Sequence, residues 1–349
     1  MANVIEIKPN DTAALLGLYR FVPAPINYFR GLLASSVFTS EDEWIEFGKI
    51  TDTRKLAPLV IPTAQGRPIY TEAANVARFK PAYVKPKDSI SPSRALKRRP
   101  GENLFQPNTL SPYARFLAIL GDILRVHRES IDNRMEWLFA QAALYGKVTL
   151  DGPDYPTTIV DFQRDPSHTV TLSGAGVVWS DPDAPIVDMI NSWVEKIRRA
   201  PFGGPVTRVT LGKNVVGPFL ANKQVQATRN LQIRGTDGTP APSIRTGDYS
   251  EMIFRLGNLE IWTTSDWYTK PDGSIGEYMD PNGVLLTGPN VQFVECYGAI
   301  LDTDAQLQAL PVFPKQWKNE DPSVTYVMTQ SAPLAVPVNP NNTLFATVL

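Results

Sequence analysis

The stretch SPYARFLAILGDILRVHRESIDNRMEWLFAQAALYG, residues 111–146, predicts one long α-helix around which the rest of the chain is arranged. Ser111 is a good N-cap because its hydroxyl can accept a hydrogen bond from the first turn, where Pro112 is also tolerated. Gly146 can adopt the left-handed conformation that ends a helix. A helix of this length is about 50 Å long, so we expect it to lie across a sheet as a spine.

The apolar residues of this helix recur at steps of three, four or seven, which predicts one buried face. They are Tyr113, Leu117, Leu120, Leu124, Ile131, Leu138, Ala142 and Tyr145. Six charged residues fall on another, polar face: Arg115, Asp122, Arg125, Glu129, Asp132 and Glu136. No heptad repeat persists along the stretch, so a coiled coil is not expected.

The chain before this helix is extended and rich in proline. Residues 1–36 combine a short helix, predicted from Asp11 to Tyr19, with an extended Pro23-Ala24-Pro25 run, so we expect an arm that packs on a neighbour. Between residues 56 and 105, prolines interrupt strand-like runs, which predicts a long two-stranded loop with its tip near residues 71–76. Such a ribbon is marginal in water alone, so another subunit should stabilise it.

After the long helix, strands and helices alternate without a strict βαβ rhythm, which predicts a mixed α/β region. We expect a helix from Asp183 to Arg199, capped by Asp183, and a second helix through Val215 and Phe219. Strands are expected at residues 44–50, 147–150, 157–162, 169–179 (a pair broken by two glycines), 207–211, 259–267, 291–301, 324–328 and 344–348.

The composition argues against several classes of protein. The 349 residues include 34 Lys and Arg and 35 Asp and Glu, so the chain lacks the strongly basic character of general nucleic-acid binders. The single cysteine allows no intrachain disulfide and fits a reducing compartment. The first residues lack the blocks of a signal peptide, and no apolar run is long enough to span a bilayer, so no membrane partner is expected.

Signals for catalysis, cofactors and metals are weak, and the sequence assigns no catalytic, cofactor-binding or metal-binding residue. His127 lies near the apolar face of the long helix and is expected to be a packed or hydrogen-bonded core histidine, whereas His168 follows a turn and is expected in solvent. Cys296 is expected to be a buried, inert thiol. The run Asp302-Thr303-Asp304 matches the start of a calcium loop but lacks the later glycine and glutamate. Residues 204–213 hold phosphate-loop residues at the wrong spacing.

A carbohydrate-active enzyme is an alternative function of a different class. The two members of a catalytic carboxylate pair are distant in sequence, and the seven tryptophans of the chain could line a sugar cleft. Packing in the core and at interfaces is the preferred interpretation of these tryptophans.

Several motifs follow one another in a fixed order along the chain. They are FKPAYVKPK at 79–87, RRPGE at 98–102, GKVT at 146–149, LDTDAQ at 301–306, FPKQW at 313–317, Asp321-Pro322 and MTQSAPL at 328–334. In this order and spacing the chain resembles the lambda-type phage major capsid protein family over nearly its whole length.

This resemblance implies an α+β fold, the Hong Kong 97-like fold of tailed-phage major capsid proteins. The parts that it implies are an N-terminal arm (1–50), an extended β-hairpin loop (51–105), a peripheral domain with the long helix (106–182), a mixed α/β axial domain (183–290) and return strands (291–349). The last strand is expected to return toward the axial domain.

The resemblance also implies a structural shell subunit and not an enzyme. Such subunits assemble into hexamers and pentamers of an icosahedral head that encloses double-stranded DNA without reading its sequence. A decoration protein, a portal and a scaffold are further partners that the resemblance implies. The protein would assemble in the host bacterial cytoplasm and remain in the capsid shell of the virion. A bacterial nanocompartment shell protein is the alternative within the same fold.

The basic residues before the long helix are predicted to be intersubunit contacts: Lys80, Lys85, Lys87, Arg94, Lys97, Arg98 and Arg99. Arginine suits bidentate pairing with carboxylates, and the cluster Glu41-Asp42-Glu43 of a second copy offers them. A phosphate-binding patch that faces packaged DNA and a solvated cluster without a partner are the alternatives. The lambda-type resemblance further implies a shell without covalent cross-links.

Overall fold

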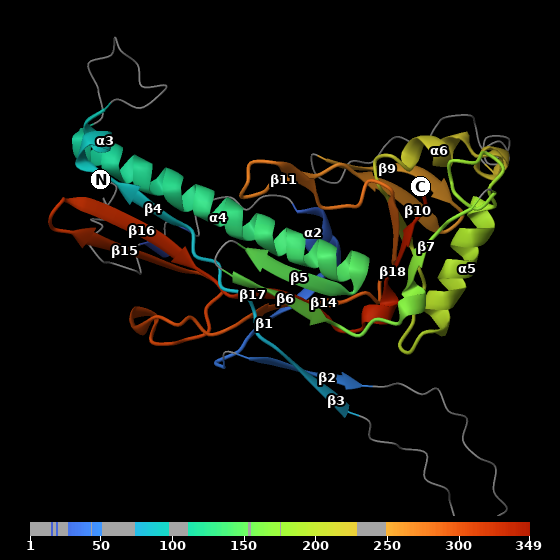
Figure 1. The fold of residues 1–349 in the computed structure, drawn as a ribbon, viewed down its shortest axis with the longest axis horizontal. Helices are drawn as coiled ribbons and strands as arrows, with labels where there is room; N and C mark the ends of the chain where they lie inside the picture. The colour runs from blue at the N-terminus through green and yellow to red at the C-terminus, as the bar shows by residue number, and fades with distance from the viewer. Residues whose placement is uncertain are drawn as a thin grey trace, which may run out of the picture.

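The structure is a computed structural model, and it shows an elongated α+β chain in which one long helix crosses toward a rounded part at one end (Figure 1). The residues that it describes are 15–16, 19, 27–42, 44–50, 74–97, 111–152, 155–174, 176–228 and 249–349.

The bounds of the helices and strands are as follows. The helices are α2 (Tyr28–Leu33), α3 (Pro92–Leu96), α4 (Pro112–Tyr145), α5 (Ile186–Arg199) and α6 (Val216–Ala221). The strands are β1 (Ala34–Thr39), β2 (Ile45–Ile50), β3 (Ala74–Phe79), β4 (Lys87–Ile90), β5 (Lys147–Gly152), β6 (Tyr155–Asp161), β7 (Thr169–Thr171), β8 (Arg208–Leu211), β9 (Ser250–Leu256), β10 (Leu259–Thr264), β11 (Trp267–Thr269), β12 (Ile275–Glu277), β13 (Gly283–Thr287), β14 (Phe293–Tyr297), β15 (Phe313–Asn319), β16 (Val324–Gln330), β17 (Pro333–Pro337) and β18 (Leu344–Thr347).

Helix α4 confirms the helix predicted from the sequence, with both ends at the capping residues. The Ser111 hydroxyl accepts a hydrogen bond from the Ala114 N–H at 3.2 Å. Gly146 ends the helix in the left-handed conformation, with φ of 65°. A side chain is also excluded at Gly146, because its Cβ would stand 2.6 Å from the Cβ of Arg164.

The division of α4 into one apolar and one polar face is wrong at four positions. Arg115, Asp132 and Glu136 are buried, with exposed fractions of 7%, 9% and 0%. They are buried because α4 is covered on several sides, by helices α2 and α3 as well as by strands β4, β5, β16 and β17. Tyr113, expected on the apolar face, lies in the first turn and is 58% exposed.

Two three-stranded sheets and a two-stranded ribbon accompany α4. One sheet has the order β15-β16-β4, and the other has the order β1-β14-β17, in which β1 runs parallel to β14. Strands β2 and β3 pair antiparallel in a ribbon that projects from the body (Figure 1). The predicted tip near residues 71–76 is wrong for residues 74–76, which belong to β3 and pair with β2. Residues 71–73 lie outside the described residues.

The rounded part is built on a six-stranded sheet of order β7-β18-β13-β8-β10-β9, with α5 and α6 beside it (Figure 1). Trp179 is fully buried in its core, and its ring centre lies 6.0 Å from the ring centres of Trp193 and Phe219. Strand β18 lies between β7 and β13, which confirms that the last strand returns to this part of the chain.

Three predictions in this part need correction. Among the described residues of 169–179, β7 is the one strand that forms, because Gly174 and Gly176 adopt φ of 106° and 78° and turn the chain. Helix α5 begins later than predicted, with Pro185 at the N-cap; the Asp183 side chain pairs with Lys223 at 2.6 Å and does not cap it. The run 259–267 is divided between β10 and β11.

Candidate assembly surfaces and a buried ionic network

The predicted intersubunit residues are spread along one segment and are not gathered at one point. They run from the end of β3, along β4, to helix α3 beside the start of α4 (Figure 1). The structure describes five of them, and all five are exposed: Lys80, Lys85, Lys87, Arg94 and Lys97. Arg98 and Arg99 lie outside the described residues, as does Glu43 of the acidic cluster.

Two of these lysines lie on aromatic rings of their own chain. The Lys85 Nζ is 4.5 Å from the centre of the Tyr83 ring. The Lys87 Nζ is 4.5 Å from the centre of the Tyr326 ring and 5.2 Å from that of Trp317, and these two rings stack at 5.4 Å. Such cation–π contacts are worth about 0.5–1 kcal/mol at exposed sites, so they orient the ammonium groups at the surface of the β15-β16-β4 sheet.

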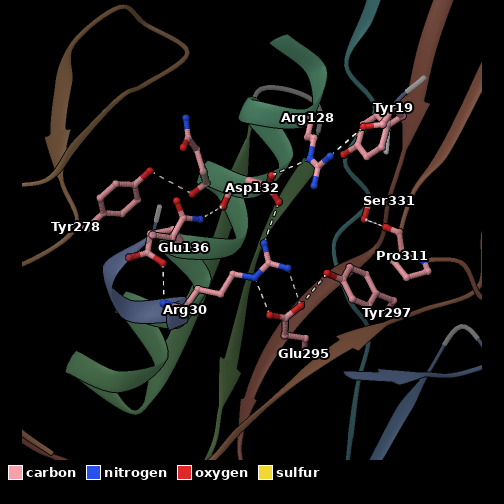
Figure 2. Close-up of polar contacts among 12 residues, drawn as sticks. Tyr19, Arg30, Arg128, Asp132, Glu136, Tyr278, Glu295, Tyr297, Pro311 and Ser331 are labelled. Carbon is pink, nitrogen blue, oxygen red and sulfur yellow. Dashed lines mark hydrogen bonds and ion pairs between the residues drawn. The ribbon is translucent and has the colours of Figure 1, made fainter. Parts of the chain in front are cut away.

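A second cluster of charges is buried between α2, α4 and β14. Arg30 on α2 donates through Nε and Nη2 to both carboxylate oxygens of Glu295, at 2.6 and 2.9 Å, and through Nη1 to Asp132 at 2.9 Å. Figure 2 shows Arg30 between these two acids. The Tyr297 hydroxyl donates to Glu295 at 3.1 Å, and the Arg128 Nε approaches the second oxygen of Asp132 at 3.6 Å. We call these five side chains and Glu136 the Arg30 network.

Glu136 is the most buried acid of the Arg30 network. Its two carboxylate oxygens accept hydrogen bonds from the backbone N–H groups of Phe29, at 2.6 Å, and Arg30, at 2.8 Å. Helix α2 has no side-chain cap of its own, so an acid of α4 satisfies its first turn. Burial raises the pKa of Glu136 to about 7 against the opposing effect of these hydrogen bonds, and the nearby Asp266 raises it further. This carboxyl therefore changes charge near neutral pH.

The C-terminal end of α4 is held by Arg164, which the sequence also did not single out. Its Nη1 donates to the Ala143 carbonyl at 2.8 Å, and its Nη2 donates to the Leu144 carbonyl and, at 2.7 Å, to the Thr169 hydroxyl of β7. Burial lowers the pKa of Arg164 to about 10. A cation at the last carbonyls complements the helix dipole, and here it also joins α4 to the six-stranded sheet.

Only the members of the Arg30 network that lie on α4 could be recognised from the sequence. Arg128, Asp132 and Glu136 stand four residues apart, so they form one stripe of α4 that could have marked a line of paired charges. Arg30 is 102 residues from Asp132 and 265 residues from Glu295. No periodicity links positions so far apart, and only the tertiary fold brings them together.

Both histidines are buried, as predicted for His127 and contrary to the prediction for His168. The His127 Nε2 donates to Asp88 at 3.1 Å, and its Nδ1 accepts from the Thr329 hydroxyl at 2.9 Å, because the carboxylate can only accept. The His168 Nδ1 donates to the Thr343 carbonyl at 3.2 Å, a contact that covers the turn in which it lies. Burial lowers the pKa of both rings.

The acids of the run 302–304 bind a lysine of their own chain. The Lys315 Nζ lies 3.0 and 3.2 Å from the two oxygens of Asp302 and 2.5 Å from an oxygen of Asp304. Gln330 also donates to Asp302, at 2.7 Å. The charge of one lysine therefore compensates part of the charge of these two carboxylates. In the part of the chain that the structure describes, no group of three His, Cys, Asp or Glu side chains is arranged to hold a metal ion, and no helix is long and apolar enough to cross a membrane.

The tryptophans do not line one cleft. Trp179 and Trp193 are buried beside the six-stranded sheet, and Trp262 is buried in the core along α4, in agreement with the packing interpretation. Trp44 and Trp267 are exposed at separate positions, on the ribbon side and on β11. Cys296 is buried as predicted, and burial raises the pKa of its thiol to about 12.

Comparisons with known proteins agree with one another. The family model described as phage major capsid protein E matches residues 11–348. The major capsid protein of Enterobacteria phage P21 is 29% identical over 312 residues, which cover 86% of this chain and 87% of that protein. The major capsid protein of Escherichia phage lambda is 26% identical over 328 residues, 93% of each chain.

A solved structure supports the same fold. The crystal structure of a prophage capsid protein from Escherichia coli CFT073 superimposes with a TM-score of 0.69 at 22% identity, and the match covers 98% of this chain and 100% of that chain. At this identity the match concerns the fold alone.

Proposed function

The chain belongs to the phage major capsid protein E family, and from this premise we propose that its copies form the hexamers and pentamers of an icosahedral head around double-stranded DNA. The protein is a major capsid protein of a tailed phage, with the Hong Kong 97-like fold, and its copies assemble into a shell. The observation that carries the proposal is the family match, which extends over residues 11–348.

In this proposal the protein has a structural role and no enzymatic activity, cofactor or membrane partner. It encloses DNA without reading the sequence, as the resemblance to the lambda-type family implies. Assembly takes place in the host bacterial cytoplasm, with a portal, a scaffold and a decoration protein as further partners. The carbohydrate-active alternative loses its support, because the tryptophans lie apart.

We propose the same division of the chain that the resemblance implies. The N-terminal arm is 1–50 and the extended loop is 51–105. The peripheral domain is 106–182 together with strands from 291–349, and the axial domain is 183–290. The sheets differ from these bounds in two places. Strand β2 of the arm pairs with β3 of the loop in one ribbon, and β7 of the peripheral range joins the six-stranded sheet of the axial domain.

Electron microscopy of the purified protein tests the function directly. We expect closed shells of uniform size that form without any other phage protein. Shells that fill with a cargo protein, and not with DNA, would favour the nanocompartment alternative. A monomer at all concentrations would overturn the assignment of a shell subunit.

The basic segment from Lys80 to Arg99 supplies intersubunit contacts in this proposal. The exposure of its five described members supports this role, since each remains accessible to a partner. Changing Arg98→Glu and Arg99→Glu together should block the assembly of empty, DNA-free shells, because acids of a neighbouring copy would then face acids. The matched control is Arg198→Glu with Arg199→Glu, an exposed pair of adjacent arginines at the end of α5. Normal empty shells that fail only at DNA packaging would point to phosphate binding.

The shell is proposed to hold together without covalent cross-links. Mature particles that are boiled in detergent should run as one band near 38.6 kDa. A ladder of multimers would contradict this proposal.

A further inference from the structure

Strand β1 is exposed along its whole length although it belongs to a sheet. All six of its residues are exposed. Val37 and Phe38 are 60% and 47% exposed, and they point to opposite faces because successive side chains of a strand alternate. Strand β14 pairs with one edge of β1, and no strand among the described residues pairs with the other. One backbone edge and both side-chain faces of β1 are therefore uncovered.

The uncovered edge carries backbone groups that are ready to pair. The Ser40 N–H, just after β1, donates to the Tyr297 carbonyl at 2.9 Å. By alternation along the strand, the N–H and C=O groups of Val37 and Thr39 point away from β14. Natural proteins usually protect such edges with charged residues, proline or a bulge. Residues 36–39 contain neither a charge nor a proline, and the one irregularity of register lies earlier, between Ala34 and Ser36.

The helix that directly precedes β1 is held in place by ion pairs, although β1 itself packs against little. Helix α2 ends at Leu33, directly before β1, and the Arg30 network ties it to both α4 and β14 (Figure 2). The three hydrogen bonds from the Arg30 guanidinium to Glu295 and Asp132 fix the position of α2 relative to α4 and β14. The chain thus presents an uncovered strand in a defined orientation.

We propose that β1 is an assembly strand, whose free edge at Val37 and Thr39 pairs with a strand of a second copy of this chain in the shell. This inference rests on the shell function described above and names one of its contacts. The small size of the contact favours a second copy of this chain as the partner. Strand β1 offers six residues over about 20 Å, whereas a stable complex of two proteins uses about 20–30 residues on each side. So small a contact becomes effective only where many copies act together in a closed, symmetric shell.

Hydrogen exchange on the full-length protein tests the proposal. Unassembled subunits are compared with shells that form from this protein alone, so that no decoration protein is present. We expect the Val37 and Thr39 amides to exchange freely in subunits and about 100-fold more slowly in shells. Equal exchange in both states would overturn the proposal, because the edge would remain open. Full protection in the subunit would also overturn it, because the chain's own residues would then cover β1.

A proline variant tests the same edge without disturbing the other one. Thr39→Pro removes an N–H that points away from β14, which an edge strand tolerates. The circular dichroism and thermal midpoint of the subunit should stay unchanged, while the yield of shells falls by about tenfold or more. The control Thr39→Val keeps the N–H and should assemble normally. Normal assembly of Thr39→Pro would refute the proposal, and if this variant does not fold, the exchange measurement decides alone.

The outcome for the native protein separates the two claims. If the native protein forms no shells, the proposed function fails and this inference fails with it. If shells form normally but the β1 amides remain unprotected, only this inference fails.

Discussion

Glu136 makes the stability of this protein depend on pH in a predictable direction. Its pKa in the folded chain is about 7, against an ordinary value of 4.5. The folded state therefore holds a proton that the unfolded state has lost between these two values. The stability that this group contributes is present below pH 4.5 and is lost as the pH rises through 7. By linkage the full change is about 3 kcal/mol at most, since one pKa unit corresponds to about 1.4 kcal/mol.

The substitution Glu136→Gln should remove this part of the pH dependence. We expect the difference in unfolding free energy between the native protein and the variant to change by about 2–3 kcal/mol between pH 5 and pH 8. Urea unfolding of unassembled subunits at several pH values measures it. Because both proteins keep His127 and His168, the contributions of these rings cancel in the difference. Glu129→Gln, at a half-exposed glutamate of the same helix, is the control and should leave the slope unchanged.

Glycine is required at position 146 for two reasons: the backbone there has a positive φ, and Arg164 leaves no room for a Cβ. Gly146→Ala should lower the unfolding free energy by about 1–3 kcal/mol, because the residue has a positive φ and its Cβ would meet Arg164. The matched control is Gly121→Ala inside the same helix, where an added Cβ meets nothing within 4 Å. That change should stabilise the protein by up to about 1 kcal/mol. Equal thermal midpoints for the two variants would contradict this account of Gly146.

Arg30 joins helix α2 to both α4 and β14 through ion pairs. Arg30→Met would leave Asp132 and Glu295 buried without their common partner, which costs about 3–5 kcal/mol when a buried ion pair loses one member. Arg125→Met removes an exposed pair with Glu129 and should cost less than about 1 kcal/mol. Denaturant unfolding of both variants measures the contrast. A small effect of Arg30→Met would mean that water replaces the guanidinium.

The elements that the sequence predicted well are those specified by local signals. The caps and periodicity of α4 lie within the helix itself, so both of its ends were predictable from residues 111–146. The buried charges on its polar face were not, because Arg30 and Glu295 come from distant segments. His168 was misassigned for the same reason: a turn motif says nothing about Thr343, which lies 175 residues further along the chain. A two-stranded ribbon was predicted within residues 56–105, but β3 pairs with β2 at residues 45–50, since prolines mark extended chain without setting the register.

Across the chain as a whole, the motifs identified the family, but the sequence did not predict which residues of two copies contact each other. The basic segment and β1 are both exposed, and one copy of the chain does not contain the residues that cover them. An intersubunit contact depends on two surfaces, whereas the sequence pattern of one element describes only one of them.

The single thiol offers a measure of how far the assembled protein opens. Cys296 is buried in β14, and burial raises its pKa to about 12, so the reactive thiolate is scarce in the folded protein. Labelling with a thiol reagent at neutral pH should therefore follow unfolding, and it should be slower in shells than in free subunits because assembly stabilises the folded state. Rapid, complete labelling of the native shell would contradict this expectation.

The length of α4 has a mechanical consequence. The helix is 34 residues long, and Arg164 and the Arg30 network anchor its C-terminal half. Its N-terminal half packs on α3, β4 and β16, so these elements move with the helix as one arm: a rotation of about 5° at the C-terminal end moves the other end by about 4 Å over a length of about 50 Å. We expect the angle between neighbouring copies, and hence the curvature of the closed surface, to depend on these few side chains around the C-terminal half of the helix.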